Sequence, residues 1–237
     1  MMISIKPFLI CPAMMKKKKM RILAPPESNI IHTIEMHTGG EPLRVISGGL
    51  PDIPGKTILE KRRFFKEHYD NIRTALLWEP RGHRDMYGAI ITEPVTGDGD
   101  FGVIFLHNEG YSTMCGHAII ALTRLVLESG FIDRSGKNPE IRIDTPAGRV
   151  VAIGHRDNKG KVVSSSFRNV PSFLLMQDET VEVPGIGRVD FDVAFGGAFY
   201  AFTDAQVLGL DMDKRHAAQL ADIGMKIKKA ITDNFNI

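Results

Sequence analysis

The chain has 237 residues, of which 43% are apolar, and this is enough for a substantial core in one large domain or two small ones. Thirty basic and 28 acidic residues leave a formal charge of +2, with the basic excess near the amino terminus, which argues against a nucleic-acid binder. No segment approaches the ~18 apolar residues of a membrane span, and two cysteines cannot form a disulfide framework, so we expect a globular cytoplasmic protein.

The first 29 residues are expected to form a disordered leader. An apolar stretch is followed there by four lysines, Lys16 to Lys19. A secretory signal carries its basic residues before the apolar part and a small-residue cleavage site after it, so this leader does not match one. Because no acidic residue precedes Glu27, a mitochondrial leader stays open as an alternative.

Strands and helices follow one another without regular alternation, which predicts a mixed α+β fold. Two strands joined by the turn HTGGEP come first, and an amphipathic helix over 57–77 follows, with apolar residues at helical spacing. A later helix over 118–127 is apolar on nearly every face and is expected to be buried, with Gly130 as its stop. The predicted strands cover 30–36, 43–47, 86–92, 101–107, 140–144, 149–155, 161–169 and 187–195, and a final helix covers 213–232.

Two segments of the chain echo each other, because TIEMHTGGEP and DFDVAFGGAFYAF each end a strand in a pair of glycines. This echo favours a duplicated architecture. We expect a first α/β half over 30–160, which carries a cysteine and the buried helix, and a partial second half over 161–237.

Cys115 lies directly before the buried helix, in the stretch NEGYSTMCGHAIIAL. The positive end of a helix dipole and its free backbone N–H groups favour a thiolate over a thiol, so Cys115 is a candidate base or nucleophile. The N–H groups of Gly116 and His117 could also accept a carboxylate from a ligand, and glycine lets that ligand approach the backbone closely.

Structural roles are the alternatives to this interpretation. Cys115 could be a small buried hydrophobe and His117 a core histidine. We predict no metal site, because no second Cys/His pair lies near them. The polar segment 81–85 is either a solvated ion-pair network or a loop that lines the same site, with Tyr87 after it as an aromatic wall.

Four motifs, MHTGGEP, EPRGHRDMYGA, NEGYSTMCGHA and DVAFGGAFYAF, occur in an order that resembles the proline racemase family. This family includes proline racemases, hydroxyproline epimerases and trans-3-hydroxy-L-proline dehydratases. The resemblance runs from about Ile31 to the end of the chain. It implies a fold like that of diaminopimelate epimerase, with two pseudo-symmetric halves, each a barrel-like sheet around a central helix, and the substrate between them.

The resemblance also implies roles for particular residues. Cys115 would be the catalytic base, the backbone of Gly116 and His117 would help to hold the substrate carboxylate, and Tyr87 would form an aromatic wall. It further implies a small imino-acid substrate, a homodimer, and no metal or organic cofactor.

Within the family, Ala118 and Ile119 after the cysteine motif resemble the branch that dehydrates trans-3-hydroxy-L-proline, so we expect a hydro-lyase. Arg84 and Tyr87 favour the same branch. A proline racemase or 4-hydroxyproline epimerase is the alternative, and such an enzyme needs a second cysteine facing the first. The family's second motif, with cysteine or threonine, would come after Ile237, so the second half is expected to be incomplete. A short form that is catalytically inactive, and that binds imino acids or dimerises, is therefore also considered.

Overall fold

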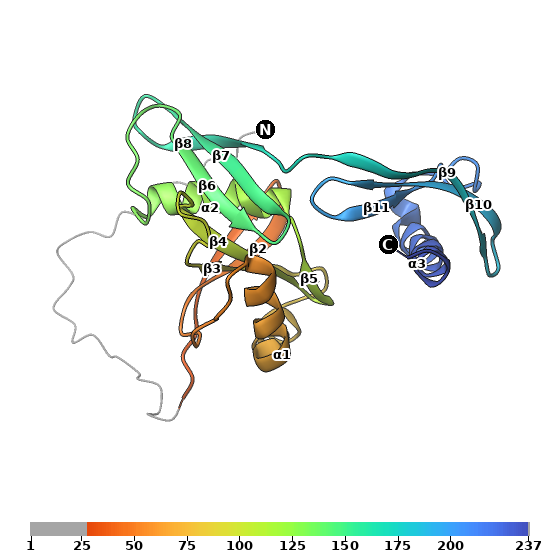
Figure 1. The fold of residues 1–237 in the computed structure, drawn as a ribbon, viewed down its shortest axis with the longest axis horizontal. Coiled ribbons are helices and arrows are strands. Elements are labelled where there is room, and N and C mark those ends of the chain that lie inside the picture. Colours follow the sequence, from red (N-terminus) through yellow and green to blue (C-terminus); the bar gives the residue numbers. More distant parts are fainter. Residues whose placement is uncertain (1–27, 237) are drawn as a thin grey trace. The chain divides into compact units, whose positions relative to one another are not determined.

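The computed structural model describes residues 28–236 (Figure 1). The expected disordered leader lies outside the described residues except for its last two positions. Residues 31–237 form one unit of the chain. Among the described helices, none is both long and apolar enough to cross a membrane.

The fold is α+β, as expected, and most predicted elements are present. Each predicted strand range overlaps a strand of the structure, and the strands at 101–107 and 187–195 have the predicted bounds. The elements in chain order are β1 (His32–Thr38), β2 (Glu41–Gly48), α1 (Ile58–Leu77), β3 (Tyr87–Thr92), β4 (Phe101–His107), β5 (Gly110–Ser112), α2 (Gly116–Glu128), β6 (Glu140–Thr145), β7 (Gly148–Arg156), β8 (Val162–Arg168), β9 (Phe173–Val183), β10 (Gly187–Phe195), β11 (Phe199–Phe202), the 3₁₀ turn η2 (Lys214–His216) and α3 (Ala217–Asn234).

The first eight strands form one sheet. Seven of them follow the order β1-β2-β3-β4-β6-β7-β8, and the short strand β5 pairs only with β4. Helix α2 packs against this sheet and contacts both of its edge strands, β1 and β8. The sheet must therefore curl around the helix for its two edges to reach it. This is the barrel-like half with a central helix that the family resemblance implies.

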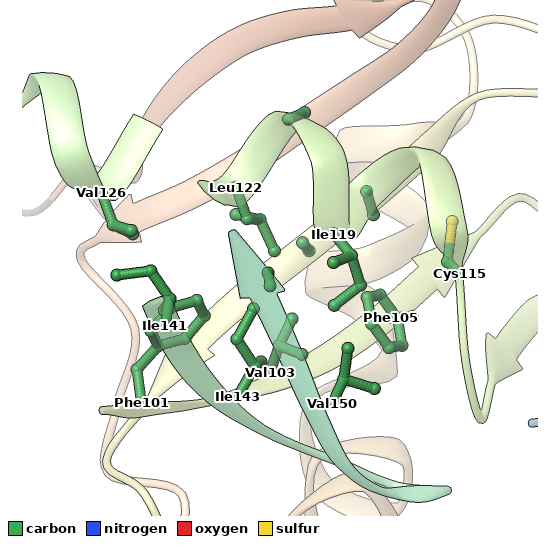
Figure 2. Close-up of a cluster of buried hydrophobic side chains, with 14 of the residues drawn as sticks. Phe101, Val103, Phe105, Cys115, Ile119, Leu122, Val126, Ile141, Ile143 and Val150 are labelled. Atoms are coloured by element: carbon green, nitrogen blue, oxygen red, sulfur yellow. The ribbon is translucent and has the colours of Figure 1, made fainter. Parts of the chain in front are cut away.

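Helix α2 is buried because its apolar residues cover nearly all of its surface. Ala118, Ile119 and Leu122 have no exposed surface. Figure 2 shows the α2 side chains directed toward sheet residues, and the sulfur of Cys115 at the start of the helix. Gly130, with φ of +75°, follows the helix end at Glu128, as a helix stop should. The core against α2 includes Phe101, Val103, Phe105, Ile141, Ile143 and Val150.

Helix α1 covers a second core, in which Phe65 and Leu77 pack with Ile90 and Ile104 of the sheet. Its amphipathic pattern predicted this arrangement. Thr57 precedes the first turn, and its hydroxyl accepts a hydrogen bond from the backbone N–H of Glu60 at 3.1 Å.

Replacing Thr57 by alanine should lower the free energy of unfolding by about 1 kcal/mol, because one N–H of the first turn of α1 loses its acceptor. Urea denaturation followed by circular dichroism measures this change. Thr74→Ala, in the same helix, is the matched control, since Thr74 only donates to the carbonyl of Asn71 within the helix. Equal losses for the two variants would show that the cap does not stabilise α1.

The second sheet has three strands in the order β11-β10-β9, and α3 packs on it through Ile227 and Ile231. Both glycine pairs form turns of antiparallel hairpins: 39–40 joins β1 to β2 and 196–197 lies between β10 and β11. Gly39, Gly40 and Gly197 have positive φ values, which explains why glycine is needed there. A long helix follows each hairpin, α1 in one case and α3 in the other.

Strands β5, β9 and β11 are absent from the sequence prediction. The strand predicted at 161–169 corresponds to β8, which pairs with β7 in the first sheet. The chain therefore changes sheets between Arg168 and Phe173, several residues after the expected division at 160/161.

Candidate active site

Cys115 is the N-cap residue of α2 and has an extended backbone (φ −147°, ψ 109°). Strand β5 ends three residues earlier, at Ser112. The hydroxyl of Thr38, at the end of β1, donates a hydrogen bond of 2.9 Å to the carbonyl of His117. This hydrogen bond holds the first turn of α2 next to the glycine-pair turn of the first hairpin. It therefore helps to fix the position of Cys115, which directly precedes that turn of the helix.

The residues predicted from the sequence line one pocket of about 360 Å³. Cys115, Gly116 and His117 come from the start of α2 and Tyr87 from β3. Sequence reasoning did not find the other lining residues. One lies directly before Cys115, and the rest come from β8 and the segment after it, from the second glycine-pair turn and the residue that follows it, and from β11. These are Met114, Phe167, Asn169, Gly196, Ala198 and Tyr200.

The thiol of Cys115 lies beside an imidazole and near a phenol ring. Its Sγ is 3.2 Å from Nδ1 of His117. The rings of His117 and Tyr87 meet edge to face, with centroids 4.9 Å apart. A thiol within hydrogen-bonding distance of an imidazole can pass its proton to that ring, which is how cysteine bases and nucleophiles are activated.

Burial raises the pKa of the Cys115 thiol above its ordinary value, and nearby Glu41 adds to this. The nearby backbone N–H of Ala118, the Tyr87 side chain and the backbone N–H of His117 act in the opposite direction without cancelling the effect of burial. The groups at the helix start therefore favour the thiolate, and burial outweighs them in the empty pocket.

Gly116 keeps the pocket open beside the thiol. A Cβ atom at this position would lie 3.2 Å from Cζ of Phe167, closer than most such contacts. The absence of a side chain therefore leaves space between α2 and β8.

The glycine-pair turn 196–197 is fastened to residues near the thiol. Nδ2 of Asn169 donates to the carbonyl of Gly196 at 2.7 Å, and the hydroxyl of Thr113 donates to the carbonyl of Gly197. A Cβ at Gly197 would lie 2.6 Å from Cβ of Met114, so only glycine fits. The motif DVAFGGAFYAF marks this turn in the sequence, but no local pattern indicates Asn169.

The polar segment 81–85 does not line the pocket. The side chains of Arg84 and Asp85 are 88% and 86% exposed, which agrees with the solvated alternative. Within residues 28–236, no group of three or more His, Cys, Asp and Glu side chains is placed to hold a metal ion.

A buried thiol beside an imidazole, in a pocket of this size at a helix start, is the arrangement that a cysteine-based site for a small molecule would need. A sequence profile described as "Proline racemase" matches residues 33–237. The chain belongs to the proline racemase family, so the resemblance seen in the four motifs is confirmed.

Curated relatives match most of this chain. A protein of Colwellia psychrerythraea named trans-3-hydroxy-L-proline dehydratase is 50% identical over 207 residues, covering 87% of this chain and 58% of that protein. A protein of Mus musculus named trans-L-3-hydroxyproline dehydratase is 43% identical over 215 residues, covering 90% of this chain and 61% of that protein. The chain thus spans about three fifths of the length of these relatives.

A solved structure supports the fold assignment. A hydroxyproline epimerase from Agrobacterium vitis, with bound trans-4-hydroxy-L-proline, superposes with a TM-score of 0.82 at 28% identity. The match covers 89% of this chain and 62% of that one. The predicted proline racemase fold is therefore confirmed, with the second half incomplete relative to that structure.

Proposed function

We propose that this chain, or a longer protein containing it, is a hydro-lyase that dehydrates trans-3-hydroxy-L-proline to pyrroline-2-carboxylate. The observation that carries the proposal is the Cys115 thiol, 3.2 Å from His117 Nδ1, in a pocket of about 360 Å³. The names of relatives at 43–50% identity support this substrate over proline or 4-hydroxyproline. A homodimer without cofactors, located in the cytoplasm, is part of the same proposal.

Cys115 acts as the base in this reaction. Its thiolate removes the proton from the α-carbon, the electrons of that C–H bond form a double bond to C3, and the C3–O bond breaks. The hydroxyl takes up one proton and leaves as water, and the enamine product tautomerises to the cyclic imine. His117 is a candidate donor of that proton, since its ring lies beside the thiol, and it could also orient the substrate.

The substrate's own charges help to form the thiolate. Its carboxylate can accept hydrogen bonds from the free N–H groups at the start of α2, which is a favourable position for an anion. Its ammonium group then brings a positive charge near the sulfur, and an opposite charge lowers the pKa of a buried thiol. A thiol that is protonated in the empty pocket can in this way become a base when the substrate binds.

Incubation of the chain with trans-3-hydroxy-L-proline in deuterated water tests the proposal, followed by proton NMR. The expected result is loss of the substrate signals and growth of pyrroline-2-carboxylate, with no reaction of L-proline or trans-4-hydroxy-L-proline. Return of α-deuterated substrate with inverted configuration would instead identify a racemase or epimerase.

Calorimetric titration with pyrrole-2-carboxylate, a planar mimic of the deprotonated substrate, separates an inactive binding protein from an enzyme. Heat of binding together with turnover agrees with the proposal. Heat of binding without turnover would contradict the hydro-lyase proposal for this chain and favour the short form that only binds imino acids.

A further inference from the structure

The side chains of Tyr87 and Ser112 meet beside the thiol although they come from different strands. Tyr87 on β3 pairs with His107 of β4, and Ser112 on β5 pairs with Phe105 on the other side of β4. Both side chains emerge on the same face of the sheet, since residues two apart on β4 share a face. The ring of Tyr87 lies 5.8 Å from that of His107, and its hydroxyl is hydrogen-bonded to Oγ of Ser112.

We propose that the Tyr87 hydroxyl donates a hydrogen bond to the Cys115 thiolate, and that Ser112 is a positioning residue that holds this hydroxyl in place. Tyr87 would then be more than the aromatic wall that the family resemblance implies. The proposal rests on the proposed function only in treating the thiolate as the reactive form of Cys115.

Three observations support this arrangement. Tyr87 and Cys115 line the same pocket, and the ring of His117 lies against both of them, with Nδ1 3.2 Å from the sulfur and its centroid 4.9 Å from that of Tyr87. The edge-to-face contact with His117 fixes the orientation of the Tyr87 ring. Burial and the nearby Cys115 raise the pKa of Tyr87 well above its ordinary value, so its hydroxyl keeps the proton that it must donate.

The direction of the hydrogen bonds follows from the chemistry of the three groups. A thiolate can only accept, so the proton of Tyr87 points to the sulfur and the Tyr87 oxygen is left to accept from Ser112. Because the Tyr87 hydroxyl accepts a hydrogen bond from Ser112, it is polarised and donates a stronger hydrogen bond to the sulfur. A pair of neutral hydroxyls can thus stabilise the thiolate in a site where burial opposes it.

Other groups that face the thiol would affect the same measurement. His117 on α2 lies beside the sulfur, and Glu41 on β2 opposes the thiolate by its negative charge. Tyr200 on β11 lines the pocket and His107 on β4 lies next to the Tyr87 ring. The test therefore changes the two proposed hydroxyls and leaves these four groups in place.

The rate of alkylation of Cys115 by iodoacetamide, measured from pH 6 to 11 in a Cys11→Ser background, reports how easily the thiolate forms. Tyr87→Phe should slow alkylation at pH 7 by about tenfold, because a hydrogen bond to a charged group is lost. At high pH, where the thiol is fully ionised, the rate should equal that of the parent. Tyr111→Phe is the matched control, since its hydroxyl donates to Asp70 at 2.7 Å on the side of α1.

Ser112→Ala should slow alkylation at pH 7 by about threefold, because Ser112 acts through Tyr87, and Ser112→Thr, which keeps the hydroxyl, should restore the rate. An unchanged pH profile in Tyr87→Phe, or an equal change of rate at every pH, would overturn the proposal. Because no substrate is present, the result does not depend on turnover. A shifted profile in an inactive chain would contradict the proposed function and leave this assignment standing.

Discussion

Replacing Cys115 by serine should lower kcat for trans-3-hydroxy-L-proline by about 10²- to 10⁴-fold, in any preparation that turns this substrate over. General base catalysis contributes a factor of this size. A serine hydroxyl is a much weaker acid than a thiol, so its anion is almost absent near neutral pH and cannot remove the α-proton. The reduction in kcat is measured from initial rates of pyrroline-2-carboxylate formation, because NMR at a single time point does not give a rate.

Cys11→Ser is the matched control, because it makes the same chemical change at the other cysteine of the chain. This variant should keep the parent rate. If Cys115→Ser retained more than about a tenth of the activity, far above the residual rate expected without a base, Cys115 would not be the base.

Replacing Asp144 by alanine should lower the free energy of unfolding by about 3–5 kcal/mol at pH 7, the usual cost of removing one partner of a buried charged network. The Asp144 side chain is only 4% exposed. It accepts hydrogen bonds from the N–H groups of Val95 and Thr96 at 2.8 and 2.9 Å and from Nε of Arg149 at 2.9 Å. Removing the carboxylate leaves these donors without their acceptor.

The contribution of the Asp144 carboxylate to the free energy of unfolding should depend on pH. Burial by itself would raise the pKa of Asp144, but hydrogen bonds from Val95, Thr96 and Arg149 hold it below its ordinary value. A carboxyl group whose pKa is lower in the folded chain than in the unfolded chain stabilises the folded state. This stabilisation is complete at pH values above the pKa of the unfolded chain, and it is lost as the pH falls through the pKa of the folded chain. The difference between the parent and Asp144→Ala should therefore shrink in acid.

Asp98→Ala is the control for Asp144→Ala. Asp98 also contacts Arg149, at 2.9 Å, but its side chain is 64% exposed. Removal of an exposed partner changes stability little. Urea denaturation of both variants at pH 7 gives the comparison, and similar losses for the two would show that burial of Asp144 does not matter.

Much of the first half of the fold is predictable from local patterns. Helix α2 is apolar on nearly every face, so its burial follows from the sequence, and β4 can be located because it lies between a turn-rich segment and Asn108. The site residues at the start of α2 were found for the same reason, since a cysteine directly before a buried helix is an unusual local feature.

The second sheet is harder to predict. Strand β9 begins with Phe173, Leu174 and Leu175, which are 43–53% exposed, and it buries only Val181 and Val183 near its end. Without alternation between apolar and polar residues, no strand signal arises. Likewise, Asn169 and Tyr200 reach the pocket only because β8 and the turn 196–197 approach α2, and such an approach is a property of the tertiary fold.

The hydrogen bond between Thr38 and His117 joins residues 79 positions apart. Helix α2 also contacts β1, the first strand of its sheet in the sequence, and β8, the last. Contacts between distant parts of a chain form slowly, because a long loop must close before they give any stability. We therefore expect the thiol pocket to be completed late in folding, with the sulfur of Cys115 unshielded in a partly folded chain until both edge strands have docked on α2.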